Sequence, residues 1–503
     1  MNLVSLNYIV LFIGTVFVYY ILPTRVRWIW LLLCSIAFYT ISGGYRTLLF
    51  LLSSIVTTYL GVHAIQKLSS IRKKRTALFV VIGLMLGQLI MIKGTDMLTG
   101  IVSLFNPASS FSIMKIAVPI GISYFTLTLI GYVVDVYREV SLPQKNILKY
   151  SLFTCYFPTL VSGPILRYNV MEKQLFLGKK LSLSIRNISF GLQRMLFGYF
   201  KKMVIADRLA IVVQTVYGDT DTYSGFFLVI ATLCYAFQLY ADFSGCIDIV
   251  MGTSEVLGID LPENFQSPFY SQTISEFWRR WHITLGTWFK DYVLYPLLIS
   301  RLFQSIGSFF KRKMGKKIGK KVTTSLGLMV IWLSLGVWHG GTLKWMIASG
   351  ILPFVYITSS EFLHPVFVKI VDKFKINTGC TSFRIFQRIR TISLMCICWV
   401  FVCSSSLMDG AHVIKSIFLK CNPLTLISDE LFNCGLNTKE ILIVIISVAI
   451  VMFVDYMKYR GFAVRTILAN QNIFFQYVVL WGFALTILLF GITGGSQFIY
   501  FQF

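Results

Sequence analysis

The feature that most constrains this chain is a series of long apolar runs that recur from its first residues to its last. A helix needs roughly 20 consecutive apolar residues to cross about 30 Å of hydrocarbon. Of the 503 residues, 56% are hydrophobic and only 13% are charged, a balance that is rare in a soluble globular protein of this size. We therefore expect an all-α, polytopic membrane helix bundle that forms a single domain over residues 1–503.

The basic residues lie in short clusters between the apolar runs. In a soluble chain, a net charge of +25 would suggest a nucleic-acid partner. Here the clustering instead matches the excess of Lys and Arg in cytoplasmic loops. Anionic lipid headgroups favour basic residues on the same side of the membrane. We therefore expect the lipid bilayer, and not nucleic acid, as the partner. The clusters lie at 25–27, 67–75, 138–149, 173–186, 311–321, 369–390 and 458–465.

Helices placed between these clusters predict about 10 to 12 transmembrane spans, with both termini outside. The first run has no basic segment before it and no small-residue cleavage site after it, so we expect it to be retained. Two apolar segments, 150–165 and 277–300, have basic residues at both ends and should be re-entrant or interfacial. The spans are expected near 5–22, 28–43, 46–64, 76–93, 113–135, 190–216, 224–250, 322–340, 343–360, 391–410, 438–456 and 472–492.

Cysteine spacing predicts no metal site. Ten cysteines are scattered along the chain, and the nearest pair, Cys396 and Cys398, lies inside an apolar run without a companion pair. Most are expected to be small buried hydrophobic residues. Cys421 and Cys434 fall in a predicted external loop, where they could form a disulfide or stay free.

His339 is the strongest candidate for chemistry, because ionisable groups at membrane depth are costly. It stands in LGVWHGG, roughly 27 Å along a helix from the basic cluster at 311–321. Gly340 and Gly341 allow a break in the helix and a close approach of substrate, and Trp338 supplies an apolar wall. A buried neutral imidazole could accept a proton from an alcohol. The alternative is a histidine that only bonds neighbouring helices.

The other polar candidates have two interpretations each. His282 lies in EFWRRWHITLGTWFKDY, which also fits an interfacial helix whose Trp278, Trp281 and Trp288 share one face. His63, His364 and His412 fall at or beyond predicted helix ends, where solvated or capping roles are ordinary. The motif YAFQLYADFSGCID carries further polar side chains that either line the same cavity or bind one another. These are Gln238, Tyr240, Asp242, Ser244 and Asp248.

Seven ordered motifs between about residues 115 and 350 resemble the membrane-bound O-acyltransferase family. The likeness is to its bacterial branch, which includes the membrane subunit of alginate O-acetyltransferase and the teichoic acid D-alanyl transferases. The motifs are PIGISYFTLTLIGYVVDVYR from Pro119, FPTLVSGPILRY from Phe157, GYFKKMVIADRLA from Gly198, YADFSGCIDIVMG from Tyr240, LPENFQSPF from Leu261, EFWRRWHITLGTWFKDYVLYPL from Glu276 and VWHGG from Val337.

The resemblance implies a helix bundle around a central tunnel, with the invariant family histidine at His339 and the second at His282. Gln238, Tyr240, Asp242, Ser244 and Trp338 are then candidates to line the tunnel. A cytoplasmic acyl thioester such as acetyl-CoA or an acyl carrier protein donates the acyl group, and no bound cofactor is expected. A thioester is already activated, so the reaction needs a base, His339, and donors for the developing oxyanion.

The external tail at 493–503 ends in FIYFQF, which resembles a Phe, any, Tyr, two any, Phe motif of cell-wall acyl-transfer systems. In that motif the tyrosine carries the acyl group, so Tyr500 would be the carrier, with Phe498 and Phe503 as the flanking residues. An extracytoplasmic acyltransferase partner would then act on polysaccharide. The alternative for the tail is an aromatic anchor at the membrane interface.

Four functions remain open at this point. The motifs IADRLA and LPENF resemble the acetyl-transferring branch more than the D-alanyl-transferring branch. They therefore favour acetyl transfer to surface or cell-wall polysaccharide, at a bacterial plasma membrane, over D-alanyl transfer to teichoic acids. A transporter or flippase would fit a multispan chain, but such proteins usually show inverted repeats, which we do not find. A lipid-directed acyltransferase would leave Tyr500 without a role.

Overall fold

The computed structural model describes residues 2–105, 119–176, 184–424, 434–495 and 498–499. Within these residues the regular structure is helical apart from an isolated antiparallel bridge between Phe265 and Trp281, which confirms the all-α prediction. The chain divides into two compact units. The first comprises Met1–Met203, Asp242–Glu263 and Leu468–Phe503, and the second comprises Val204–Ala241 and Asn264–Ile467.

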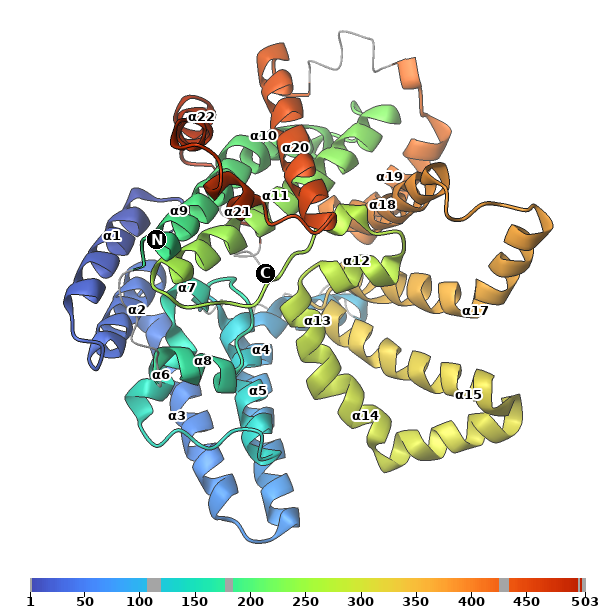
Figure 1. Ribbon diagram of the computed structural model, residues 1–503. Coiled ribbons are helices and arrows are strands. Elements are labelled where there is room, and N and C mark those ends of the chain that lie inside the picture. Colours follow the sequence, from blue (N-terminus) through green and yellow to red (C-terminus); the bar gives the residue numbers. More distant parts are fainter. Residues whose placement is uncertain (1, 106–118, 177–183, 425–433, 496–497, 500–503) are drawn as a thin grey trace. The chain divides into compact units, whose positions relative to one another are not determined.

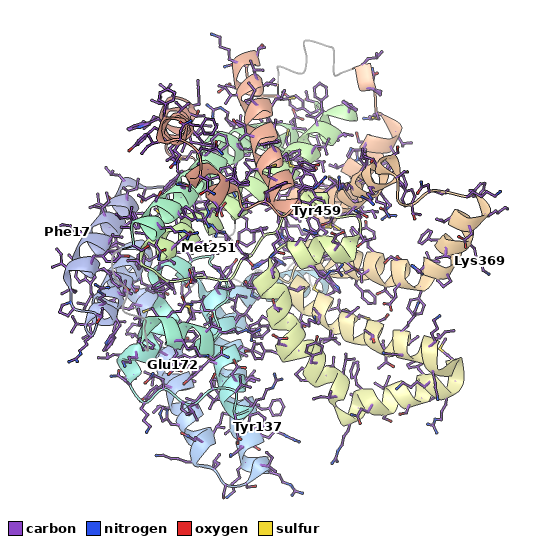
Figure 2. All side chains as sticks on the ribbon, in the orientation of Figure 1. Phe17, Tyr137, Glu172, Met251, Lys369 and Tyr459 are labelled. Atoms are coloured by element: carbon purple, nitrogen blue, oxygen red, sulfur yellow. The ribbon has the colours of Figure 1, made fainter. Side chains whose placement is uncertain are left out.

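The first unit begins with helices that alternate in direction, and α3 and α4 form a long hairpin in Figure 1. Apolar side chains cover the outer faces of these helices; Phe17, labelled in Figure 2, is 69% exposed. The helices are α1 (Leu6–Ile21), α2 (Arg27–Gly43), α3 (Tyr45–Lys67), α4 (Ile71–Phe105), α5 (Ile122–Tyr137), α6 (Ile147–Cys155), α7 (Phe157–Leu160), α8 (Tyr168–Leu175), α9 (Ile185–Tyr199) and α22 (Ile473–Phe490).

Glycines bring α9 into backbone contact with α11 (Phe226–Val256) in the first unit. A Cβ atom on Gly198 would stand 2.7 Å from the Gly245 carbonyl oxygen, and one on Gly191 would stand 2.6 Å from the Gly252 carbonyl oxygen. Small residues at such crossings let membrane helices approach closely. The α9 helix continues into a π-helix, η1 (Phe200–Ala206), which carries two lysines toward α11.

The second unit holds the remaining helices. They are α10 (Asp207–Gly218), α12 (Ile274–Arg280), α13 (Ile283–Phe289), α14 (Tyr295–Ile299), α15 (Arg301–Trp338), α16 (Leu343–Met346), α17 (Leu352–Lys373), α18 (Thr381–Cys403), α19 (Leu407–Leu419) and α20 (Thr438–Tyr459). The short α21 (Val464–Ala469) crosses the boundary between the units, as does α11.

The basic cluster at 311–321 is helical, which corrects its interpretation as a loop. Figure 1 shows α15 turning back on itself, and the turn is Gly315, whose φ of 80° is unfavourable for residues with a Cβ atom. Gly307 on one arm packs against Thr323 on the other, because a Cβ atom there would lie 3.3 Å from the threonine hydroxyl. The cluster therefore covers the tip of a helical hairpin.

The interpretation of 277–300 as one interfacial helix is wrong, whereas the re-entrant alternative stays a prediction. The segment is broken into α12, α13, the π-helix η3 (Lys290–Leu294) and α14. His282 lies at the first break with a φ of 47°, and Trp281 and Trp288 are buried instead of facing headgroups. The prediction that this segment does not span the membrane agrees with the shortness of these helices.

Eight helices within the described residues are long and apolar enough to cross a membrane, and α1, α2 and α5 are shorter apolar helices. The exact number of spans stays a prediction. Large apolar side chains point outward on these helices, as on α22, where Leu488 is 77% exposed. Such surfaces fit a lipid environment, since soluble proteins rarely expose continuous apolar faces.

Candidate functional site

His339 caps the C-terminal end of α15. The Gly340 N–H donates to the Val337 carbonyl oxygen at 3.2 Å, and the Gly341 N–H donates to the Gly336 carbonyl oxygen at 3.1 Å. This pair of bonds is a Schellman motif, which explains why glycines follow the histidine. The helix therefore ends at the point where the sequence predicted a break.

Two tryptophans enclose the His339 ring. The Trp345 ring stacks on it with centroids 5.8 Å apart and planes at 18°, and the Trp338 ring meets it edge-on at 4.8 Å. A Cβ atom on Gly340 would lie 2.9 Å from Trp345 Cδ1, so the stacking depends on glycine there. His339 as a residue is half-buried, whereas its Nδ1 atom is buried.

His282 lies in the same unit, and its ring also lies near Trp338. Its ring centroid is 6.4 Å from that of Trp338, and its side chain is buried. Burial, together with the neighbouring His339, lowers the pKa of His282 well below its ordinary value. The two histidines that the sequence singled out, 57 positions apart in numbering, are therefore neighbours that both lie near Trp338.

Asn264 fixes the orientation of His282, and the sequence analysis missed it. Its Oδ1 lies 3.3 Å from His282 Nδ1 and accepts hydrogen bonds from the Thr284 N–H and hydroxyl, each at 3.0 Å. Because Oδ1 receives the backbone donor, the orientation of the amide is determined. Its Nδ2 is buried and has no hydrogen-bond partner among the described residues, so it is a donor available to a bound substrate.

Two of the tunnel candidates, Gln238 and Tyr240, lie on the part of α11 in the second unit. The Tyr240 hydroxyl donates a hydrogen bond to the carboxylate of Asp455 on α20, and its ring packs on Phe269 at 5.1 Å. Tyr240 therefore joins helices within this unit. Gln238 is buried. The tunnel itself stays a prediction.

Asp242 and Ser244 belong to the first unit, where they bind lysines that the sequence analysis did not assign. Asp242 Oδ1 lies 2.7 Å from Lys202 Nζ, and both side chains are fully or almost fully buried. Lys201 donates to Ser244 at 2.9 Å and pairs with Asp248, which Arg194 also contacts at 2.9 Å. These polar side chains therefore bind basic residues of α9 and η1, and their place along a tunnel stays a prediction.

Of the three tail candidates, only Phe498 lies within the described residues. Phe498 is fully buried, whereas Tyr500 and Phe503 lie outside the described residues, so the carrier role stays a prediction. Cys421 is exposed, Cys434 is buried, and both carry free thiols in this structure.

The motifs around both histidines fall within a match to a known family. The family model described as MBOAT, membrane-bound O-acyltransferase family, covers residues 48–407. The chain belongs to the membrane-bound O-acyltransferase family. This MBOAT protein is an integral membrane protein, and the family resemblance drawn from the motifs is confirmed.

The MBOAT relatives carry three different names. The chain is 31% identical over 308 residues to a probable alginate O-acetylase of Pseudomonas syringae pv. tomato, covering 61% of this chain and about half (53%) of that relative. It is 29% identical over 416 residues to a peptidoglycan O-acetyltransferase of Helicobacter pylori, covering 77% and 73% of the two chains. It is 26% identical over 308 residues to a teichoic acid D-alanyltransferase of Streptococcus thermophilus, covering 60% and 68%.

Replacing Asn264 with Asp should move the acid limb of the acyl-transfer pH profile upward by about one unit or more. In the wild type the lowered pKa keeps His282 neutral at neutral pH, so activity that needs the neutral ring is lost only as the pH falls to that lowered value. A carboxylate next to Nδ1 favours the imidazolium, so the same loss begins at higher pH. Transfer rates of the purified variants across pH measure the shift.

Asn264→Ala is the matched control, because it removes the Oδ1 acceptor without adding charge. It leaves the buried Thr284 N–H without that acceptor, which costs about 1–3 kcal/mol, and should lower activity at every pH without an upward shift of the limb. An unchanged limb in Asn264→Asp would show that this contact does not control His282.

Proposed function

We propose that this MBOAT protein is an O-acyltransferase that moves an acetyl group from a cytoplasmic thioester across the membrane to polysaccharide at the cell surface. The observation that carries the proposal is that the rings of His282 and His339 both lie near Trp338 in one unit. The names of the relatives support it, because they describe acetyl transfer to alginate and to peptidoglycan. The membrane would be a bacterial plasma membrane.

His339 would act as the general base, because the residue is half-buried and its ring is fixed by the stacked Trp345. It takes the proton of an acceptor hydroxyl while the oxygen attacks the thioester carbonyl. The C–S bond breaks, a C–O ester bond forms, and the departing thiolate takes up the proton from His339. Neutral His282 and the Asn264 Nδ2 are suited to donate or relay hydrogen bonds as charge develops.

The first acceptor would be the Tyr500 hydroxyl, and a separate extracytoplasmic acyltransferase would pass the acetyl group on to polysaccharide. A tyrosyl ester is a reasonable intermediate, because a phenolate is a better leaving group than a sugar alkoxide. The sequence pattern around Tyr500 supports this part of the proposal.

Trapping the acyl group on the protein tests the proposal directly. Protein reconstituted in bilayers is incubated with isotope-labelled acetyl-CoA and analysed by peptide mass spectrometry. A labelled acetyl group on the C-terminal peptide is expected. A parallel incubation with a D-alanyl thioester of a carrier protein tests the second candidate, which the teichoic acid D-alanyltransferase relatives favour. Failure to label the protein with either donor would overturn the tyrosyl relay.

A further inference from the structure

The chain after α22 returns to the helix pair formed by η1 and α11 within the first unit. The Ile492 N–H donates to the Met203 carbonyl oxygen at 3.0 Å. Met203 lies in the π-helix η1. Further along, the Ile499 N–H donates to Asp242 Oδ2 at 2.8 Å. The tail is therefore bonded to the same pair of helices at two places.

The second contact uses a buried ion pair. Asp242 directs Oδ1 to Lys202 and Oδ2 to the Ile499 N–H, so one carboxylate joins the helix lysine to the tail. The Lys202 ammonium also lies 4.6 Å from the centroid of the Phe498 ring, and both side chains are fully buried. A buried charge pair needs further partners to offset its desolvation. The tail supplies two of them, a backbone donor and an aromatic face.

A neighbouring ion pair on the same two helices also has helix partners. Lys201 lies one residue before Lys202, and Asp248 lies six residues after Asp242. Ser244 and Arg194 add hydrogen bonds to this pair. Tail residues are among the partners of the Lys202–Asp242 pair.

We propose that the Lys202–Asp242 pair is an internal docking site for the C-terminal tail. Phe498 gives the site its selectivity for an aromatic residue, and the Ile499 N–H fixes the register of the backbone. Tyr500 is the next residue in the sequence. Lys202 and Asp242 are positioning residues. The docking stands on these contacts, and only its use in acyl transfer rests on the proposed function.

Carboxypeptidase digestion of the full chain in detergent, followed by intact mass measurement, tests the docking without any acyl donor. In the wild type, trimming should stop with Phe498 and Ile499 retained. Ile499→Pro removes the N–H donor, and Ile499→Ala keeps it. Because proline itself resists carboxypeptidase, the Ile499 variants are compared by chymotrypsin cleavage after Tyr500. This cleavage should become about tenfold faster in the Pro variant and stay near wild type in the Ala variant, because it follows the population of the open tail. Equal cleavage of all three would overturn the proposal.

A charge exchange separates docking from helix stability. Lys202→Asp combined with Asp242→Lys keeps an ion pair between the helices but places an ammonium where the Ile499 N–H needs an acceptor. Thermal stability should recover relative to the single variants, whereas tail protection should stay lost. Restored protection in the exchange variant would contradict the assignment.

If the exchange variant does not insert, the Ile499 variants decide alone, because they change only the tail. The acyl readout is separate. Loss of tail protection together with normal labelling of Tyr500 would overturn the positioning role, whereas a protected tail without label would overturn the proposed relay and leave the docking site intact.

Discussion

His339→Ala should abolish acyl transfer while the protein still inserts and folds. The change removes the proposed base, and a missing general base alone lowers rates by about 10²–10⁴-fold. His339 is half-buried and ends a helix, so its loss leaves no sealed cavity in a packed core. Transfer is measured as acetyl groups on surface polysaccharide in cells and as label on purified protein, with insertion checked by size-exclusion chromatography.

Two controls distinguish the base from the packing. His339→Gln keeps polar atoms beside Trp345 but cannot take up a proton at neutral pH, so it should be as inactive as the Ala variant. His63→Ala removes another half-buried histidine, whose Nδ1 lies 2.8 Å from the Tyr59 carbonyl oxygen within α3. It should transfer normally. Substantial transfer by His339→Gln would refute the assignment of the base.

Hydropathy predicted the helices well, because the length and apolar character of a span are local properties. It failed at 311–321, where repeated lysines suggested a loop. Lysine is a good helix former, and a single glycine, Gly315, is enough to turn the chain between two arms. Hydropathy also failed around His282, since tryptophan spacing suggested one continuous helix. The helix breaks at His282, and a positive φ at a histidine cannot be predicted from the sequence pattern.

The site was predictable only in part for a similar reason. His339 and His282 stood out as rare ionisable groups in apolar surroundings. Asn264 did not stand out, because asparagine close to proline is common in turns. Its role is recognised only from its hydrogen bond with Thr284 in the folded structure. Lys202 and Asp242 were visible as charges in apolar helices, but their pairing depends on which helices are neighbours, and that is a tertiary fact.

The glycines offer a signal that could have revealed this pairing. Gly191 and Gly198 are seven residues apart on α9, and Gly245 and Gly252 are seven apart on α11. Two matched small-residue repeats indicate a close antiparallel crossing. Such a crossing would have placed the lysines that follow Gly198 beside the aspartates that flank Gly245.

Tyr500→Phe should eliminate acetyl transfer to polysaccharide, because it removes one hydroxyl and keeps the aromatic ring. If the tail is only an interfacial anchor, phenylalanine serves equally well, since both residues favour the membrane interface. If the hydroxyl carries the acetyl group, the relay is broken at its exit, and the label disappears from the C-terminal peptide. Polysaccharide acetylation and peptide mass spectrometry on the same cells measure both consequences.

The matched control is Tyr477→Phe on α22, which removes a phenolic hydroxyl from an exposed position in the same C-terminal segment. It should leave acetylation unchanged. Because the tail backbone and Phe498 are untouched in Tyr500→Phe, carboxypeptidase protection of the tail should also be unchanged. Normal acetylation by Tyr500→Phe, with a protected tail, would mean that the tail docks for another purpose and that His339 delivers the acyl group to a different acceptor.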